Sequence, residues 1–236
     1  MSTSGVTTNQ LTRNQIIESA LRKLGVLAIG QTPTSEDYTN ATLAFNALIG
    51  EFRALGLELW TRTTYSFGLT TNVSSYNIGS GQTLNTPYPI KMLQAYRTDT
   101  GNTTRIPMEV VPNYNFNLFP AASGGRPIQL TYQPKVNYGI IQVWPVPDAD
   151  ANTNSTVNIV YTRPLEYMAA STDTIDFPEE WVQPIIYNLA VRLAPEWGIS
   201  IPDRQQLMKE AQMYLDNALG NGVEDGSFYF QPYTKI

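Results

Sequence analysis

The sequence predicts an α+β fold. A four-helix body, formed by N-terminal and C-terminal helix pairs, carries an inserted antiparallel β-sandwich or β-barrel domain and an extended C-terminal tail. Over residues 11–56 and again over 176–220, apolar residues recur every three or four positions, the period of an amphipathic helix. Over residues 57–175, short alternating runs are separated by Gly, Pro and Asn, as in antiparallel sheets. Each helical stripe is too wide for one partner helix to cover, so we expect the two pairs to pack together.

The N-terminal pair begins with a capping signal. Thr12 is followed three residues later by Gln15, which is the spacing of a capping box. We expect the first helix to end at Gly25 and the second to begin at Thr34 or Ser35, where carboxylates in the first turn suit the helix dipole. The predicted buried residues are Ile16, Ile17, Ala20, Leu21 and Leu24 in the first helix, and Ala41, Phe45, Leu48, Phe52 and Leu55 in the second.

The inserted domain is predicted to contain short strands. We expect them over residues 57–67, 73–78, 92–97, 105–111, 128–133, 138–144 and 156–163, with one helical turn within 114–120. A polar segment over 148–155 begins like a calcium-binding loop. However, Thr153 and Ile159 stand where such a loop needs Gly and a bidentate Glu, so we predict a solvated hairpin loop there.

The C-terminal pair begins near Asp176, with Pro178 close to the first helical position. Residues 221–236 are expected to form an extended aromatic tail, and residues 1–10 a flexible arm. The predicted buried residues are Trp181, Ile185, Ile186, Leu189, Ala190 and Leu193 in the third helix, and Leu207, Ala211, Tyr214, Leu215 and Ala218 in the fourth.

Composition excludes most enzyme classes. The chain contains neither histidine nor cysteine, which removes histidine bases, thiolate nucleophiles and nearly all zinc sites. We therefore expect no cofactor, no metal and no enzymatic activity. The formal net charge of −5 disfavours a groove that grips DNA phosphates, but it suits a surface over which DNA slides. No run approaches the roughly 18 apolar residues of a membrane span, and the polar start predicts no secretion signal, so no membrane partner is expected.

Three groups of residues are candidates for function. Carboxylates at Asp173, Asp176, Glu179 and Glu180 could serve a cell-wall hydrolase, although acidic residues at a helix start are expected for the dipole alone. Arg22 and Lys23 form a basic patch that is either solvated or a partner contact. The tail aromatics suit docking onto a neighbouring protein, and the predicted contact residues are Phe228, Tyr229, Phe230, Tyr233 and Ile236. A carbohydrate-binding β-module on a helical base is a third open interpretation.

Three motifs resemble a known family. The first helix ends Ala20-Leu21-Arg22-Lys23-Leu24-Gly25-Val26; the second carries Leu43, Leu48 and Phe52 ahead of Gly56 and Trp60; the third ends Ala190-Val191-Arg192-Leu193-Ala194-Pro195-Glu196-Trp197-Gly198. In this order they resemble the head-to-tail adaptors, or connectors, of short-tailed phages. These comprise the packaged-DNA stabilisation proteins and the tail tubular proteins of the A type. The size of the β insertion resembles the tubular branch.

The resemblance implies a structural virion protein, made in the host cytoplasm and located at the head-tail junction. Such proteins form a homo-oligomeric ring, expected to be twelve-fold, that docks under the portal protein. The helical bodies would surround a channel for double-stranded DNA, the tail would reach the portal, and the β-domain would meet the downstream tail or nozzle protein.

Overall fold

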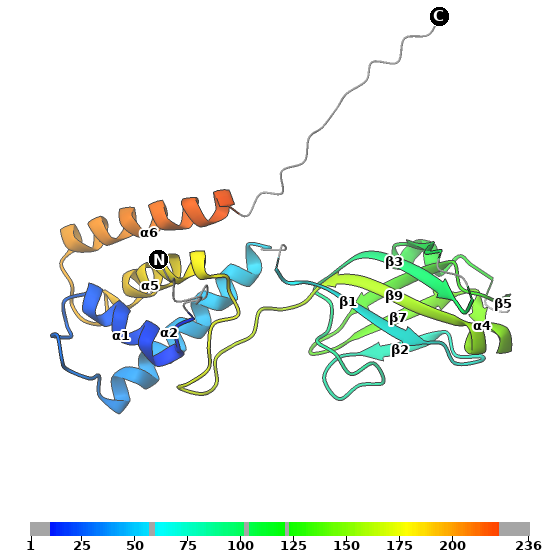
Figure 1. Ribbon diagram of the computed structural model, residues 1–236. Coiled ribbons are helices and arrows are strands. Elements are labelled where there is room, and N and C mark those ends of the chain that lie inside the picture. Colours follow the sequence, from blue (N-terminus) through cyan, green and yellow to red (C-terminus); the bar gives the residue numbers. More distant parts are fainter. Residues whose placement is uncertain (1–9, 57–59, 102–103, 121–122, 222–236) are drawn as a thin grey trace, which may run out of the picture. The chain divides into compact units, whose positions relative to one another are not determined.

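A computed structural model describes residues 10–56, 60–101, 104–120 and 123–221 (Figure 1). The chain divides into two compact units, one made of Met1–Ala54 with Glu166–Ile236 and the other of Leu55–Leu165. The aromatic tail predicted over 221–236 lies outside the described residues except for Asn221, and the arm predicted over 1–10 lies outside them except for Gln10.

The helical unit contains α1 (Arg13–Lys23), α2 (Ser35–Ala54), α5 (Val182–Leu193) and α6 (Ile201–Asn221). Helix α5 contacts α1, α2 and α6, and Figure 1 shows α6 running alongside it. The residues predicted to form the buried face of the third helix are all buried, because α5 is covered on several sides.

The start of α1 confirms the predicted capping box. The Thr12 hydroxyl accepts a hydrogen bond from the Gln15 backbone N–H, and the Gln15 side chain accepts one from the Thr12 N–H at 2.9 Å. A hydrogen bond joins α1 to α2, because the Tyr38 hydroxyl donates to Glu18 Oε1 at 2.6 Å. Burial is the largest cause that raises the pKa of Tyr38 to about 12, and the bond to Glu18 adds to it.

An aromatic cluster anchors the end of α2. Phe52 lies edge-on to Phe177 and Trp181, with ring centroids 5.9 and 5.6 Å apart. Leu55, predicted to be buried, is exposed because α2 ends at Ala54 and the apolar stripe ends with it.

The third helix begins later than predicted. Pro178 caps a 3₁₀ turn over Glu179–Trp181, and α5 follows at Val182. The 3₁₀ turn carries the two carboxylates that the sequence placed in the first α-helical turn, so these residues still lie at a helical start.

The β unit is built on a seven-stranded sheet with the order β1-β9-β3-β4-β6-β7-β2. Its strands are β1 (Arg62–Gly68), β2 (Ser75–Ile78), β3 (Lys91–Asp99), β4 (Ile106–Val110), β6 (Gln129–Pro134), β7 (Gly139–Trp144) and β9 (Ser155–Thr162). Neighbours are antiparallel except β4 and β6, which pair in parallel. A pair of two-residue strands, β5 (Gly124–Gly125) and β8 (Val146–Pro147), lies apart from this sheet. The sheet curls into a half-barrel, where the sequence predicted an antiparallel sandwich or barrel.

The last strand of the unit lies between the first and third. Figure 1 shows β9 between β1 and β3, and the strand pairing places Ile159 of β9 opposite Tyr65 of β1 on one side and Ala95 of β3 on the other. Strand β9 is therefore hydrogen-bonded to a neighbouring strand along both of its edges. The core on the inner face of the sheet includes Phe67, Tyr76, Ile78, Ala95, Met108, Leu130, Ile141, Val143, Val157, Ile159 and Tyr161.

The hairpin predicted from 128–133 and 138–144 is confirmed as β6 and β7, which pair antiparallel. A glycine in this hairpin has a packing role. The ring of Tyr132 on β6 covers Gly139 on β7 so closely that a Cβ there would overlap it. The Tyr132 hydroxyl also donates to the Pro89 carbonyl, which fixes the ring over the glycine.

The predicted hairpin loop over 148–155 is wrong, because a short helix, α4 (Ala149–Asn154), occupies it. Asp148 is its N-cap and accepts from the Ala151 N–H at 2.7 Å. Ala151 is fully buried, which anchors the helix to the core. The helical turn expected within 114–120 is present one residue earlier as α3 (Asn113–Phe116).

Candidate interaction sites

The basic residues Arg22 and Lys23 lie at the rim of a groove in the helical unit. The groove has a volume of about 510 Å³ and lies between the end of α1, Tyr187 of α5 and the first turns of α6. Arg22 forms an ion pair with Glu18 at 3.4 Å, and the Lys23 ammonium lies 5.0 Å from the centroid of the Tyr187 ring.

Two carboxylates of α6, Asp203 and Glu210, line the same groove. Two cations and two carboxylates thus share one concave surface, with the Tyr187 ring among them. This balance of charge suits a protein segment better than a phosphate backbone, which favours an excess of cations.

Two carboxylates of the acidic cluster considered for hydrolysis accept hydrogen bonds from backbone N–H groups of the helical unit. Asp173 Oδ2 accepts from the N–H groups of Ala169 and Ala170 at 2.9 and 2.7 Å. Asp176 Oδ2 accepts from the Glu166 N–H at 3.3 Å. These carboxylates shape the segment that leads back into the helices. Within the described ranges, no group of three or more acidic side chains is placed to hold a metal ion.

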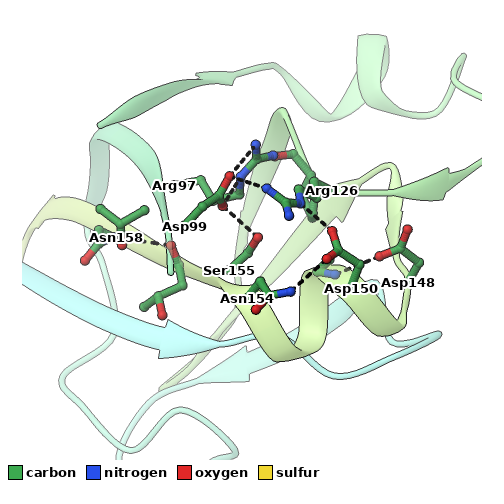
Figure 2. Close-up of polar contacts among 12 residues, drawn as sticks. Arg97, Asp99, Arg126, Asp148, Asp150, Asn154, Ser155 and Asn158 are labelled. Atoms are coloured by element: carbon green, nitrogen blue, oxygen red, sulfur yellow. Dashed lines mark hydrogen bonds and ion pairs between the residues drawn. The ribbon is translucent and has the colours of Figure 1, made fainter. Parts of the chain in front are cut away.

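The β unit contains an ionic cluster that the sequence did not predict (Figure 2). Arg97 and Asp99 on β3 are joined by bonds of 2.8 and 3.2 Å. Arg126 donates to Asp99 at 2.7 Å and to Asp150 of α4 at 2.5 Å, and the Ser155 hydroxyl donates to Asp99 at 2.7 Å. The cluster joins β3, β9, α4 and the segment before β6 at one end of the sheet.

Alternation along β3 brings this cluster together. Ala95, Arg97 and Asp99 are two residues apart, so all three point to the inner face. Two charged residues at alternating positions of a strand with an apolar inner face are the signal that could have revealed the cluster. Arg97 also donates to the Pro127 carbonyl at 2.7 Å, which explains how a buried guanidinium is tolerated.

The contacts within the ionic cluster shift the pKa values of three of its groups. Burial alone would raise the pKa of Asp99, but hydrogen bonds from Ser155 and Arg97 and the charges of Arg97 and Arg126 lower it below the ordinary value. Hydrogen bonds from Arg126 and Asn154 lower the pKa of Asp150, and the bond to Asp150 is the main cause of a raised pKa for Arg126. These shifts favour the charged forms of all three groups near pH 7, so the ion pairs of the cluster persist there.

The predicted tail contacts, Phe228, Tyr229, Phe230, Tyr233 and Ile236, lie outside the described residues. The sites that are described all contain charged side chains. The carboxylates bond backbone N–H groups, the ionic cluster fastens a sheet to a helix, and the groove presents mixed charge. The carboxylates and the ionic cluster thus make contacts within the chain that hold its fold.

The chain belongs to the SU10 adaptor protein family, whose model matches residues 12–229. The match spans both units. A comparison with curated proteins finds no match. Membership supports a structural adaptor role in a phage and implies a place at the head-tail junction, with the portal and tail proteins as partners. In the part of the chain that the structure describes, no helix combines the length and apolar character needed to cross a membrane.

Proposed function

We propose that this protein is a ring-forming head-to-tail adaptor of a short-tailed phage. It is a counterpart of the packaged-DNA stabilisation proteins and the tail tubular proteins of the A type. It docks under the portal, extends the DNA channel and connects it to the tail. The observation that carries this proposal is the family match over residues 12–229, which spans the helical and β units together. In the assembled ring, twelve copies pack through a four-helix body formed by the two helix pairs.

The charge of the subunit supports a role in passing DNA. Each copy carries a formal net charge of −5, so a ring of copies repels the phosphate backbone. Double-stranded DNA then moves through the channel without sequence-specific contacts.

Different parts of the chain serve different partners in this proposal. The tail aromatics anchor to the portal as large apolar side chains that fill pockets. The β unit meets the downstream tail or nozzle protein. The groove beside Arg22 and Lys23 contacts a partner through its paired charges.

Mass measurement of the purified protein, alone and with a portal, tests the proposal. We expect a discrete ring that forms on the portal, and a particle whose mass corresponds to a whole number of copies. A chain that stays single beside the portal at every concentration would overturn the proposal.

A further inference from the structure

Three exposed apolar side chains of helix α6 lie outside the face that packs on α5, with the polar Gln205 and Gln212 between them. Ile201, Met208 and Leu219 are 73%, 50% and 38% exposed. They are separated by seven and eleven residues, close to two and three turns of helix, so they lie in one line. Arg204 lies beside the first two, one turn after Ile201. We call these four residues the α6 stripe.

A groove with a mixed apolar and polar lining lies on another face of the helical unit. It has a volume of about 650 Å³ and is lined by Asn40, Leu43 and Ala44 of α2 and by Arg192 and Glu196 near the end of α5. Leu43 is 68% exposed, although it lies in the middle of a helix. We call this surface the α2 groove.

The α6 stripe and the α2 groove lie on opposite sides of α5. This helix contacts α2 and α6, and Figure 1 shows it between them. A head-to-tail interface needs two different surfaces on separate faces of one body, because each copy must bind one neighbour with each surface. The helical unit meets this geometric condition.

The charges of the two surfaces are complementary. On the α6 stripe, the Arg204 side chain has no ion-pair or hydrogen-bond partner among the described residues. The α2 groove has an exposed carboxylate at Glu196, and Glu36 is exposed on α2 outside the groove, one turn before Asn40. Its own cation, Arg192, is already bonded to Glu51. A cation on one surface thus matches carboxylates in and beside the other.

We infer that the α6 stripe of one copy seats in the α2 groove of the next copy. Met208 packs against Leu43, and Arg204 approaches Glu36 and Glu196. This inference rests on the proposed ring and names the surfaces that build it. The contact is heterologous, so it repeats from copy to copy and closes when the rotation per copy divides a full turn.

Cysteine cross-linking tests the contact directly, because the natural chain contains no cysteine. Leu43→Cys and Met208→Cys are made in separate full-length chains, assembled together and oxidised. We expect a cross-linked dimer from the mixture and none from either variant alone. The matched control is Met213→Cys, since Met213 lies on the same helix, is 51% exposed and points away from the α6 stripe. Cross-linking of either single variant to itself would indicate a symmetric contact and would overturn the inference.

Charge variants give an independent readout. Met208→Glu and Leu43→Glu each place a carboxylate in the apolar contact, and we expect self-association to weaken by at least about 100-fold. Met213→Glu should assemble as the natural protein does. A mixture of the first two variants retains one intact stripe and one intact groove, so it should form pairs that grow no further.

The outcomes separate this contact from the ring itself. Rings that still form with Met208→Glu or Leu43→Glu, at natural concentration, would overturn the contact and leave the ring standing. A natural chain that never self-associates, even on a portal, would overturn both. Thermal unfolding of each variant shows whether it folds. The cysteine variants add no charge, so they keep the test decisive if a glutamate variant fails to fold.

Discussion

Arg97 and Asp99 form a two-point ion pair on the inner face of β3, where both side chains are buried. They are neighbours because they are two residues apart on one strand. The pair is not isolated, since Arg126 and Ser155 bond the same carboxylate. The buried Asp99 carboxylate thus accepts hydrogen bonds from three side chains.

Replacement of Asp99 should therefore destabilise the β unit strongly. Asp99→Asn keeps the shape but leaves the buried Arg97 guanidinium without its counter-charge, a change expected to lower the free energy of unfolding by about 3–5 kcal/mol. Urea unfolding monitored by tryptophan fluorescence measures the loss. The control is Asp150→Asn, which removes a carboxylate that is largely exposed and should have a much smaller effect. Equal decreases in the free energy of unfolding of the two variants would show that burial of the Arg97–Asp99 pair does not increase its contribution to stability.

The same pair should make stability depend on acid pH. The pKa of Asp99 is lower in the folded protein than its ordinary value, about 3.9 in an unfolded chain. As the pH falls below about 5, the unfolded state binds protons first, so the free energy of unfolding decreases. The contribution of Asp99 is complete above this range and is lost as the pH falls through its folded-state pKa. In Asp99→Asn the decrease should be shallower, which urea midpoints measured at several pH values between about 5 and 2.5 can show.

Gly139 should tolerate no side chain. A Cβ at this position would overlap the Tyr132 ring, which is itself held by its bond to Pro89, so neither partner moves freely. We expect Gly139→Ala to lower the free energy of unfolding by about 1–3 kcal/mol, the usual effect of overpacking.

Two comparisons isolate this clash. Gly68→Ala on β1 adds a methyl group where no other atom lies within 4 Å, so it should change stability by less than about 0.5 kcal/mol. In a Tyr132→Ala background, Gly139→Ala should destabilise much less than in the natural chain. An unchanged effect in that background would show that the ring is not the obstacle.

Local patterns in the sequence were sufficient for the helices and most strands. The Thr12 capping box, the buried face of α5 and the β6–β7 hairpin depend on residues close in sequence, and all are confirmed. The α4 helix was missed because alternating Asp and Asn suggested a loop, whereas Asp148 acts as an N-cap and Ala151 anchors the turn.

Long-range pairing could not be read from the same patterns. The position of β9 between β1 and β3 depends on contacts between residues about 60 to 100 positions apart, as in the pairs of Ile159 with Ala95 and with Tyr65. The ionic cluster depends on that pairing, because Ser155 reaches Asp99 only when β9 lies beside β3. Periodicity gives the face of each strand but not its neighbour.

Removal of the tail should separate portal binding from folding. A chain ended after Gly226 retains every described residue, so we expect its thermal unfolding to be unchanged and its binding to the portal to be abolished. A full-length chain with serine at Phe228, Tyr229 and Phe230 tests the aromatic rings apart from the length of the tail, and it should bind as poorly. Sedimentation with the portal measures both variants. Because Met208 and Leu43 remain, the truncated chain should still self-associate. Normal portal binding by the truncated chain would show that the tail is not the anchor, and a loss of thermal stability would show that the aromatics pack on their own domain.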